Sequence, residues 1–263
     1  MFSWLKRKSA AVAPMPVHTP AHVPAHIPSG IRIYAFGDVH GRLDCLEDLL
    51  TRIKADAADY SGRKIVIGLG DYIDRGPASK GVIDRLMQPL GDGLDGEFLL
   101  GNHEQVLLGL FEEDRKGATW LTYGGVETLL SYNIQIPVGG FTPELVNHVQ
   151  EQLRAHFPAD HREWLLQRPT HLTYGDYHFV HAGVNPQHPL DAQSDGDRLW
   201  IRHAFLDYTG MLEKVVVHGH TISDEIEIRP HRIGIDTGAY ASGRLSAIVL
   251  EGENRRVLQT DRP

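Results

Sequence analysis

Residues 31–41 read IRIYAFGDVHG, and this stretch decides the fold class. Its first six residues, Ile31–Phe36, are rich in β-branched and aromatic side chains, which predicts a strand, and a polar turn bounded by glycines follows them. Residues 42–53 then carry apolar side chains at helical spacing, which predicts a helix. The stretch therefore begins a strand–turn–helix unit whose polar residues lie at the end of the strand.

The same order occurs twice more along the chain. Residues 64–69 (KIVIGL) predict a strand before a helix near residues 78–87. Residues 97–100 predict a short strand before a helix that begins at Asn102. Because strands and helices alternate, we expect an α/β fold with a largely parallel sheet and right-handed crossovers.

The middle of the chain is predicted to be a helical insertion. Thr142 followed by Pro143 is typical of a helix start, and the helical pattern continues to about His156. From Thr170 onward the chain is predicted to be mostly strands.

The composition excludes several classes of protein. The chain has 263 residues, of which 41% are hydrophobic, and this is enough for a large core. No run approaches the roughly 20 apolar residues of a membrane-spanning helix, so we expect no transmembrane segment. The net charge of −8 disfavours nucleic acid as a partner. Because Cys45 is the single cysteine, no intramolecular disulfide can form, and we expect a cytoplasmic protein.

Residues 1–30 differ in composition from the rest of the chain. They contain three basic residues, no acidic residue, and a proline at every fourth position from 16 to 28. Regular prolines prevent a helix, so we predict a flexible Pro/His-rich N-terminal tail before a catalytic domain over residues 31–263. Metal chelation is a minor alternative for three histidines at the same spacing, His18, His22 and His26. The first eight residues, MFSWLKRK, suit weak peripheral contact with an anionic membrane.

Five glycine-flanked polar motifs follow the predicted apolar strands. They are GDVHG at 37–41, GDYIDRG at 70–76, GNHE at 101–104, HAG at 181–183 and GHT at 219–221. Ligands of α/β sheets bind beyond the carboxyl ends of the strands, so we expect the chemistry at these motifs. Each motif alone has a structural explanation, such as a turn, a helix cap or a core histidine. Five motifs with complementary ligand types favour a metal site instead.

The side chains in these motifs suit divalent cations. Asp38 and His40 stand two residues apart, so on an extended segment they project to the same side and can reach one ion. Asp71 has two carboxylate oxygens with which it can bridge two ions. Donors for the second ion are available on Asn102, His181 and His220. Nitrogen and oxygen donors without a thiolate favour manganese, iron or zinc over calcium or magnesium.

Together, the five motifs resemble the signatures of the PPP family of metallophosphatases, within the calcineurin-like metallophosphoesterases. The resemblance covers about residues 31–250, and GIDTGAY at 234–240 is closer to the bacterial branch than to the eukaryotic one. It implies a four-layer α/β/β/α sandwich with a helical insertion. It also implies two divalent metal ions, the first held by Asp38, His40 and Asp71 and the second by Asp71, Asn102, His181 and His220.

The resemblance also implies catalytic roles. His103 would be the general acid, Asp74 the carboxylate that orients it, and Arg75 a phosphate-binding residue. The pattern LWIR at 199–202 makes Arg202 the candidate for a second phosphate-binding arginine. Asn102 and His103 would also contact the substrate. A hydroxide that bridges the two metal ions, expected to be manganese, would attack the phosphorus directly.

The function that this resemblance implies is a metal-dependent phosphomonoesterase acting on phosphoserine and phosphothreonine in proteins or peptides. Phosphotyrosine and small aryl phosphates are further candidate substrates. The enzymatic alternative is a nucleotide hydrolase of the diadenosine tetraphosphate type, which usually carries Asp where this chain has Glu104. A non-catalytic phosphate-binding scaffold is the alternative from another class, and the presence of both His103 and Asp74 disfavours it. His218 and Tyr240 stay open as further members of the site.

Overall fold

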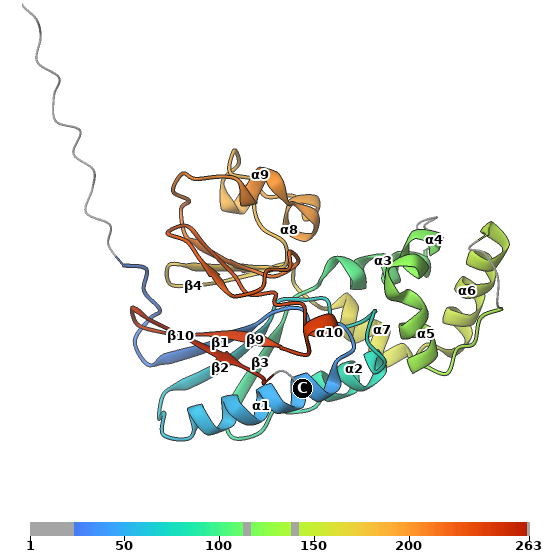
Figure 1. The fold of residues 1–263 in the computed structure, drawn as a ribbon, viewed down its shortest axis with the longest axis horizontal. Helices are drawn as coiled ribbons and strands as arrows, with labels where there is room; N and C mark the ends of the chain where they lie inside the picture. The colour runs from blue at the N-terminus through green and yellow to red at the C-terminus, as the bar shows by residue number, and fades with distance from the viewer. Residues whose placement is uncertain (1–23, 113–116, 138–141, 262–263) are drawn as a thin grey trace, which may run out of the picture.

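Two five-stranded sheets face each other in the computed structural model, which describes residues 24–112, 117–137 and 142–261 (Figure 1). The strand order is β10-β9-β1-β2-β3 in the first sheet and β4-β5-β6-β8-β7 in the second. Helices cover the outer face of each sheet (Figure 1). The expected four-layer α/β/β/α arrangement is therefore confirmed.

The first sheet contains the three strands that the N-terminal sequence predicts. Its strands are β1 (Ile31–Phe36), β2 (Arg63–Gly68), β3 (Leu94–Phe98), β9 (Ser246–Glu251) and β10 (Asn254–Gln259). β1, β2 and β3 are parallel, as expected, whereas β9 and β10 add an antiparallel edge. β3 begins three residues before the predicted start at residue 97, because its exposed residues 95–96, which lack the apolar pattern of a strand, still pair with β2.

The second sheet comes entirely from the C-terminal third of the chain. Its strands are β4 (His171–Tyr174), β5 (Tyr177–Val180), β6 (Val215–His218), β7 (Glu227–Ile228) and β8 (Arg232–Gly234). β5, β6 and β8 are parallel, so the segments that follow them leave the sheet at the same edge.

Successive side chains along a strand point alternately into the core between the two sheets and into the layer between a sheet and its helices. On β1, Ile33 and Ala35 point between the two sheets, whereas Tyr34 and Phe36 point toward the helices on the outer face. Those helices are α1 (Leu43–Ala57) and α2 (Ser79–Met87). The outer face of the second sheet is covered by η2 (Leu190–Ala192), α8 (Asp195–Trp200) and α9 (His203–Leu206). A short helix, α10 (Ala239–Ser242), lies between β8 and β9.

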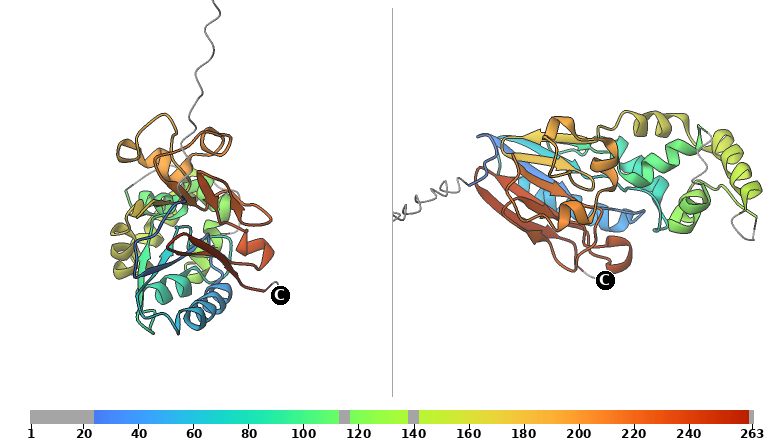
Figure 2. Two further views of the ribbon diagram at one scale, coloured as in Figure 1. Left: turned by 90° about the vertical axis from the view of Figure 1, so that its left-hand side faces the viewer. Right: turned by 90° about the horizontal axis from the view of Figure 1, so that it is seen from above.

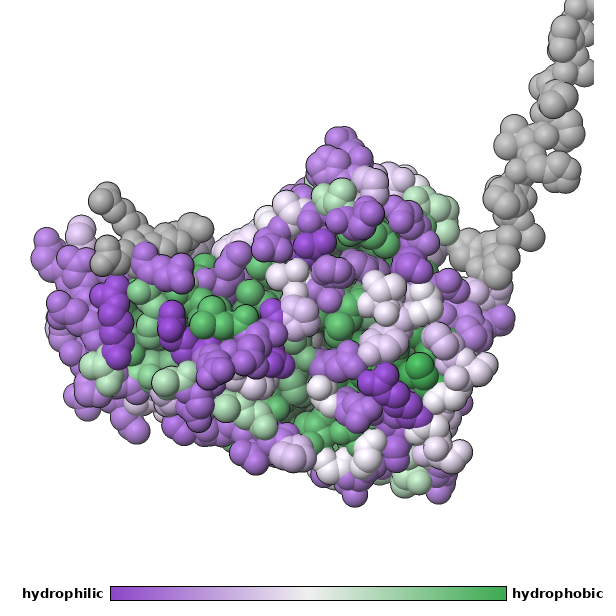
Figure 3. Space-filling model, turned by 180° about the vertical axis from the view of Figure 1, so that it is seen from behind, coloured by the Kyte–Doolittle hydropathy of each residue, from purple (hydrophilic) through white to green (hydrophobic). Residues whose placement is uncertain are grey.

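The predicted helical insertion extends beyond one end of the sandwich (Figure 2). Its elements are α3 (Asn102–Leu110), α4 (Gly117–Trp120), the π-helical turn η1 (Leu121–Gly125), α5 (Val126–Ser131), α6 (Pro143–His156) and α7 (Ala159–Leu166). The hydroxyl of Thr142 accepts a hydrogen bond from Leu145 N at 3.3 Å, which confirms the predicted start of α6. Seen from behind, the molecular outline dips between this insertion and the region of α8 and α9 (Figure 3).

Residues 24–30 pack against the sandwich. Ala25 and Ile27 are buried in the core between the sheets. Ile27 N donates a hydrogen bond to Gly252 O at 2.9 Å, and the Tyr177 hydroxyl donates one to Ala25 O at 3.3 Å. The last seven residues of the predicted tail therefore belong to the folded body.

The remaining expectations about the tail concern residues 1–23. His18, His22 and the MFSWLKRK segment lie outside the described residues, so chelation and membrane contact stay predictions from the sequence. Of the helices that the structure describes, none combines the length and the apolar character needed to cross a bilayer.

Candidate active site

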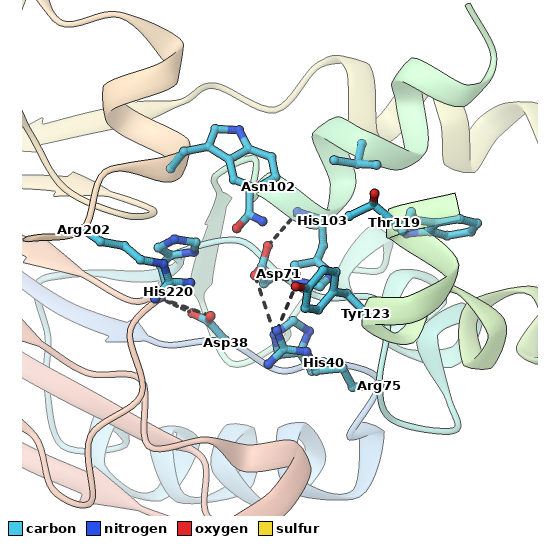
Figure 4. Close-up of a pocket in the computed structure, with 13 residues that line it drawn as sticks. Asp38, His40, Asp71, Arg75, Asn102, His103, Thr119, Tyr123, Arg202 and His220 are labelled. Carbon is cyan, nitrogen blue, oxygen red and sulfur yellow. Dashed lines mark hydrogen bonds and ion pairs between the residues drawn. The ribbon is translucent and has the colours of Figure 1, made fainter. Parts of the chain in front are cut away.

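The polar motifs meet where the parallel strands of both sheets end. There the loops and the helical insertion enclose a cavity of about 310 Å³ (Figure 4). The predicted residues that line it are Asp38, His40, Asp71, Arg75, Asn102, His103, Arg202 and His220. His181 is fully buried beside them, with its Nε2 2.8 Å from Asn102 Oδ1. Asp74 is also buried, and it reaches the cavity through its contact with His103.

Backbone strain is concentrated in these loops. Seven described residues other than glycine have a positive φ, and five of them belong to the predicted site. The five are His40 (45°), Asp71 (54°), Asp74 (72°), Arg75 (67°) and His220 (63°). A positive φ costs energy in side chains of this kind, so surrounding contacts must hold the loops in place.

One such contact is the buried carboxylate of Glu104. Its Oε2 accepts from Asp71 N at 2.8 Å and from Gly101 N at 3.0 Å, while its Oε1 accepts from Tyr72 N at 2.8 Å and Ile73 N at 3.2 Å. Burial and repulsion from Asp71 raise the pKa of Glu104 to about 8, and the backbone donors act in the opposite direction. Glu104 therefore fastens the GDYIDRG loop to the start of α3 and does not line the cavity.

Two histidines present lone pairs to Asp71. The Nδ1 atoms of His40 and His181 lie 2.8 Å from Ile73 O and 2.9 Å from Leu69 O. A carbonyl oxygen only accepts hydrogen bonds, so each Nδ1 carries the proton and each Nε2 is an unprotonated acceptor. Both Nε2 atoms face Asp71 Oδ2, at 3.6 Å for His40 and 3.5 Å for His181.

Burial keeps these imidazoles neutral. It lowers the pKa of His40 to about 3 and, together with the neighbouring His181, lowers that of His220 to about 2. His220 Nδ1 lies 3.2 Å from His181 Nε2. Lone pairs converging on a carboxylate repel one another unless a cation lies among them, so this donor set fits divalent metal ions.

Two groups of side chains have the spacing that metal binding requires. They are His40–Asp71–His103 and Asp71–His181–His220. Asp71 belongs to both groups, as a bridging ligand would. Asp38 also lies against this cluster, and its two carboxylate oxygens accept from His220 N at 3.1 and 3.2 Å.

Asp236 is a buried member of the site that the sequence analysis did not single out. It follows β8, and its Oδ1 accepts from Gly238 N at 2.8 Å. Burial and the nearby Asp71 raise the pKa of Asp236 to about 6, and burial and Asp236 raise the pKa of Asp38. The available signal was its place in GIDTGAY, after the apolar stretch 233–235, which repeats the pattern of the other motifs.

His103 and Asp74 form the predicted dyad. His103 Nδ1 lies 2.6 Å from Asp74 Oδ2. Burial alone would lower the pKa of His103, but the carboxylates of Asp71 and Asp74 outweigh it and raise the pKa to about 9. The imidazole is therefore protonated near neutral pH.

The helical insertion supplies the other partners of Asp74. Trp120 Nε1 donates to Asp74 Oδ2 at 2.8 Å, and the Thr128 hydroxyl donates to Oδ1 at 2.5 Å. Burial raises the pKa of Asp74, and these hydrogen bonds to both carboxylate oxygens act in the opposite direction. The sequence analysis missed Trp120 and Thr128, because their local pattern is that of ordinary helix residues.

The two arginines reach the cavity from opposite sides (Figure 4). Arg75 lies with its guanidinium carbon 4.6 Å from the centre of the Tyr240 ring, and its Nη2 is 3.4 Å from His103 Nε2. Arg202 is exposed, and its Nη1 donates to the Thr221 hydroxyl at 3.2 Å. Tyr240 therefore supports Arg75 at the edge of the site.

His218 faces away from the cavity. Its Nδ1 is 3.1 Å from Gly219 O, its Nε2 is 3.4 Å from Arg232 Nη1, and its ring packs 5.0 Å from that of Phe205. Burial lowers its pKa to about 4. The position is that of a core histidine on the outer face of the second sheet.

Comparisons with known proteins agree with this geometry. A bis(5'-nucleosyl)-tetraphosphatase (asymmetrical) of Oceanobacillus iheyensis is 25% identical over 82% of this chain and 88% of its own length. Serine/threonine-protein phosphatase 2 of Escherichia coli is 26% identical over 81% of this chain and 90% of its own. The crystal structure of a cold-active protein-tyrosine phosphatase of a Shewanella species superposes with a TM-score of 0.53, at 20% identity, and covers 89% of this chain and 83% of its own.

A family model also matches most of the chain. The calcineurin-like phosphoesterase model aligns with residues 31–224, which contain every predicted site residue. The fold, the converging donors and this match lead to one conclusion. The chain belongs to the calcineurin-like phosphoesterase family.

Proposed function

We propose that this chain is a dinuclear metal-dependent hydrolase of dinucleoside tetraphosphates, with a phosphoprotein phosphatase as the second candidate. The observation that carries the first candidate is the placement of Arg75 and Arg202 on opposite sides of the pocket (Figure 4). A chain of phosphates offers a separate anionic group to each guanidinium, whereas a phosphate monoester offers one.

Two further points support this substrate class. Relatives along the chain carry the tetraphosphatase name in both its symmetrical and asymmetrical forms. The argument against it from Glu104 loses its force, because that carboxylate binds four backbone amides and does not line the cavity.

We infer that two divalent cations, manganese before iron or zinc, bind at this centre. Asp38, His40 and Asp71 would hold the first, and Asp71, Asn102, His181 and His220 the second. Such a pair, when bound, lowers the pKa of coordinated water and supplies a nucleophile near neutral pH. The neutral imidazoles and the convergence on Asp71 support this assignment.

The other polar side chains bind and protonate the substrate. Arg75 and Arg202 neutralise the phosphate oxygens as negative charge spreads over them. His103 donates the proton on Nε2 to the departing oxygen, and that atom lies beside the Arg75 guanidinium. Asp74 holds Nδ1 and so keeps the imidazole oriented and charged.

One observation favours the second candidate. Asp74 Oδ2 lies 2.6 Å from His103 Nδ1 and keeps the imidazole charged, so its proton is held until a strongly basic group takes it. A serine or threonine alkoxide needs that proton, whereas a departing nucleotide phosphate is a weak base. Phosphotyrosine and small aryl phosphates would be accepted by the same machinery, because their leaving groups demand less of the acid.

A side-by-side assay separates the candidates. The manganese-loaded protein is given diadenosine tetraphosphate, a phosphoserine peptide and a phosphotyrosine peptide, and kcat/KM is compared on one preparation, with chelated protein as the control. We expect the highest value on diadenosine tetraphosphate. A higher value on a phosphopeptide would establish the second candidate instead. The absence of metal-dependent turnover on all three would indicate a phosphate-binding scaffold.

A further inference from the structure

Exposed aromatic side chains gather at the mouth of the pocket. Among the described residues, the three exposed aromatic residues are Tyr123 (61% exposed), Trp200 (41%) and Tyr240 (36%). Tyr123 and Trp200 line the cavity, and the ring of Tyr240 lies 5.6 Å from that of His40. Exposed aromatic side chains gathered at the mouth of a pocket mark a place where a ligand binds.

Tyr240 already has a partner at this site. The Arg75 guanidinium lies over its ring, so Tyr240 serves to hold an arginine. Tyr123 and Trp200 are more exposed and leave much of each ring accessible. The aromatic surface open to a ligand is therefore that of these two residues.

The fold holds the side chain of Trp200 and the backbone at Tyr123 in place. Trp200 ends α8, and its Nε1 donates to Gln105 Oε1 on α3 at 2.7 Å. Tyr123 lies in the kink of η1, next to Gly124 at a φ of 109°. A Cβ on Gly124 would lie 2.4 Å from Arg75 N, so the kink of η1 packs directly against the backbone of the Arg75 loop.

Each aromatic residue is close to one of the two arginines. Trp200 stands two residues before Arg202. On the other side, Arg75 N donates to Gly124 O at 3.2 Å, which ties Arg75 to the residue after Tyr123. An anion-binding group beside a flat apolar ring matches one end of a nucleotide, which joins a phosphate to a planar base.

We propose that Trp200 and Tyr123 are stacking platforms for nucleobases, one on each side of the phosphate-binding centre. The proposal rests on the proposed function in one respect only, namely that a single substrate carries a base for each platform. A base stacked on an aromatic side chain gains about 1–3 kcal/mol, which corresponds to roughly 5-fold to 150-fold in affinity. We expect the platforms to accept different bases, because every base has a flat π face.

Calorimetry can measure the contribution of the base without any turnover. The ligands are the phosphonate analogue of AMP and the matching base-free phosphonate analogue of ribose 5-phosphate, neither of which has a phosphoester bond at that position. On manganese-loaded protein, we expect the ligand with the base to bind at least 5-fold more tightly. Trp200→Ala should remove most of this difference, Trp200→Phe should keep it, and Tyr123→Ala should reduce it.

Two comparisons keep the test specific. Leu130→Ala, which removes another exposed apolar side chain from the insertion, should leave both affinities unchanged. Equal binding of the two phosphonates to the unmodified protein, or equal losses for both in Trp200→Ala, would overturn the base platforms.

A kinetic arm separates this proposal from the proposed function. Trp200→Ala should raise KM for diadenosine tetraphosphate by a larger factor than KM for base-free tripolyphosphate. If diadenosine tetraphosphate is not hydrolysed, the proposed function fails, while the calorimetric preference for the base still decides the platforms. If it is hydrolysed by a protein that shows no preference for the base, only the platforms fail.

Discussion

The floor and the walls of the pocket are built in opposite ways. The floor consists of the loops after the strands, with Asp38, His40, Asp71, His181 and His220, and all of these side chains are buried. The walls carry Tyr123, Trp200 and Arg202, which are exposed. The floor is strained and locked by hydrogen bonds, whereas the walls offer accessible rings and a guanidinium.

This difference suggests that the floor carries out the reaction and that the walls select the substrate. Converging donors need fixed positions, because an imidazole lone pair misplaced by a fraction of an ångström no longer reaches a shared cation. Exposed rings and arginines can differ between relatives without disturbing those donors. We therefore expect changes in the floor to stop the reaction, and changes in the walls to alter which substrates react.

The largest effect should come from the metal donors in the floor. Chelation should abolish turnover and Mn²⁺ should restore it. His220→Ala should lower turnover by more than the roughly 10–100-fold that changes in outer partners of metal ligands cause. Elemental analysis should show less bound metal in the same protein. The control is His156→Ala, an exposed histidine on α6. Full turnover by protein shown to be metal-free would refute the proposed chemistry.

Removal of the acid should have the next largest effect. His103→Asn should slow phosphoserine hydrolysis by roughly 10²-fold to 10⁴-fold, and p-nitrophenyl phosphate hydrolysis distinctly less, since nitrophenolate leaves without a proton. Asp74→Asn should give a milder form of the same pattern, because the ring stays in place. Both substrates are assayed after metal content is shown to be unchanged. Equal losses on both would remove the acid role and leave the metal centre intact.

The floor was largely predictable from the sequence, for a physical reason. A strand end, a glycine and a donor side chain lie within a few residues of one another, so local pattern places Asp38, Asp71 and His220 correctly. Asp236 escaped because GIDTGAY also reads as a strand and a tight turn. The sequence also could not reveal that the Glu104 carboxylate points toward the backbone amides of the GDYIDRG loop.

The contacts that support the floor and the core were less predictable, because they join residues distant in sequence. Trp120 and Thr128 contact Asp74 although they are 46 and 54 residues away in the sequence. The periodicity of a helix does not indicate such a contact. Ile27 lies between prolines, which suggested a linker, yet it is fully buried between the sheets. Local pattern therefore indicates which side chains the fold brings together, but not the contacts that support them.

Thr128 tests how strongly the insertion supports the floor. Thr128→Val removes the hydroxyl that donates to Asp74 Oδ1. A lost hydrogen bond to a charged group costs about 1.5–3 kcal/mol, so kcat on the phosphoserine peptide should fall roughly 10-fold or more. Thr128→Ser, which keeps the hydroxyl, should restore most of it. A loss in Thr128→Val that is the same on p-nitrophenyl phosphate would indicate general loosening instead of a weakened acid.

Arg202 tests the polar part of the walls. Arg202→Lys keeps the positive charge but loses the planar fork that binds two phosphate oxygens, so kcat/KM should fall roughly 10-fold. Melting temperature should not change, because the side chain is exposed. The measurement is kcat/KM for diadenosine tetraphosphate and for the phosphoserine peptide, and an unchanged value on both would mean that another group binds the phosphate on that side.

The smallest effect on catalysis should come from residues 1–30, of which the described part, residues 24–30, lies outside both regions. Deleting residues 1–23 should leave melting temperature and kcat unchanged. Deleting residues 1–30 also removes Ile27, whose burial is worth about 1.5–3 kcal/mol, and the bond from Ile27 N to Gly252 O. The melting temperature should then fall by about 3–12 °C.

Ile27→Ala in the full chain separates packing from chain length. It should reproduce part of that fall in melting temperature, since it leaves the backbone bond to Gly252 and removes only side-chain contacts. The kcat on p-nitrophenyl phosphate should stay the same in both deletion variants and in Ile27→Ala, because none of the described residues 24–30 lines the cavity. If the chain without residues 1–30 has the same melting temperature as the full chain, the contacts of Ala25 and Ile27 contribute nothing to stability. If kcat falls together with the melting temperature, the floor of the pocket depends on contacts at the distant edge of the sandwich. The floor would then be less independent of the rest of the molecule than its own contacts indicate.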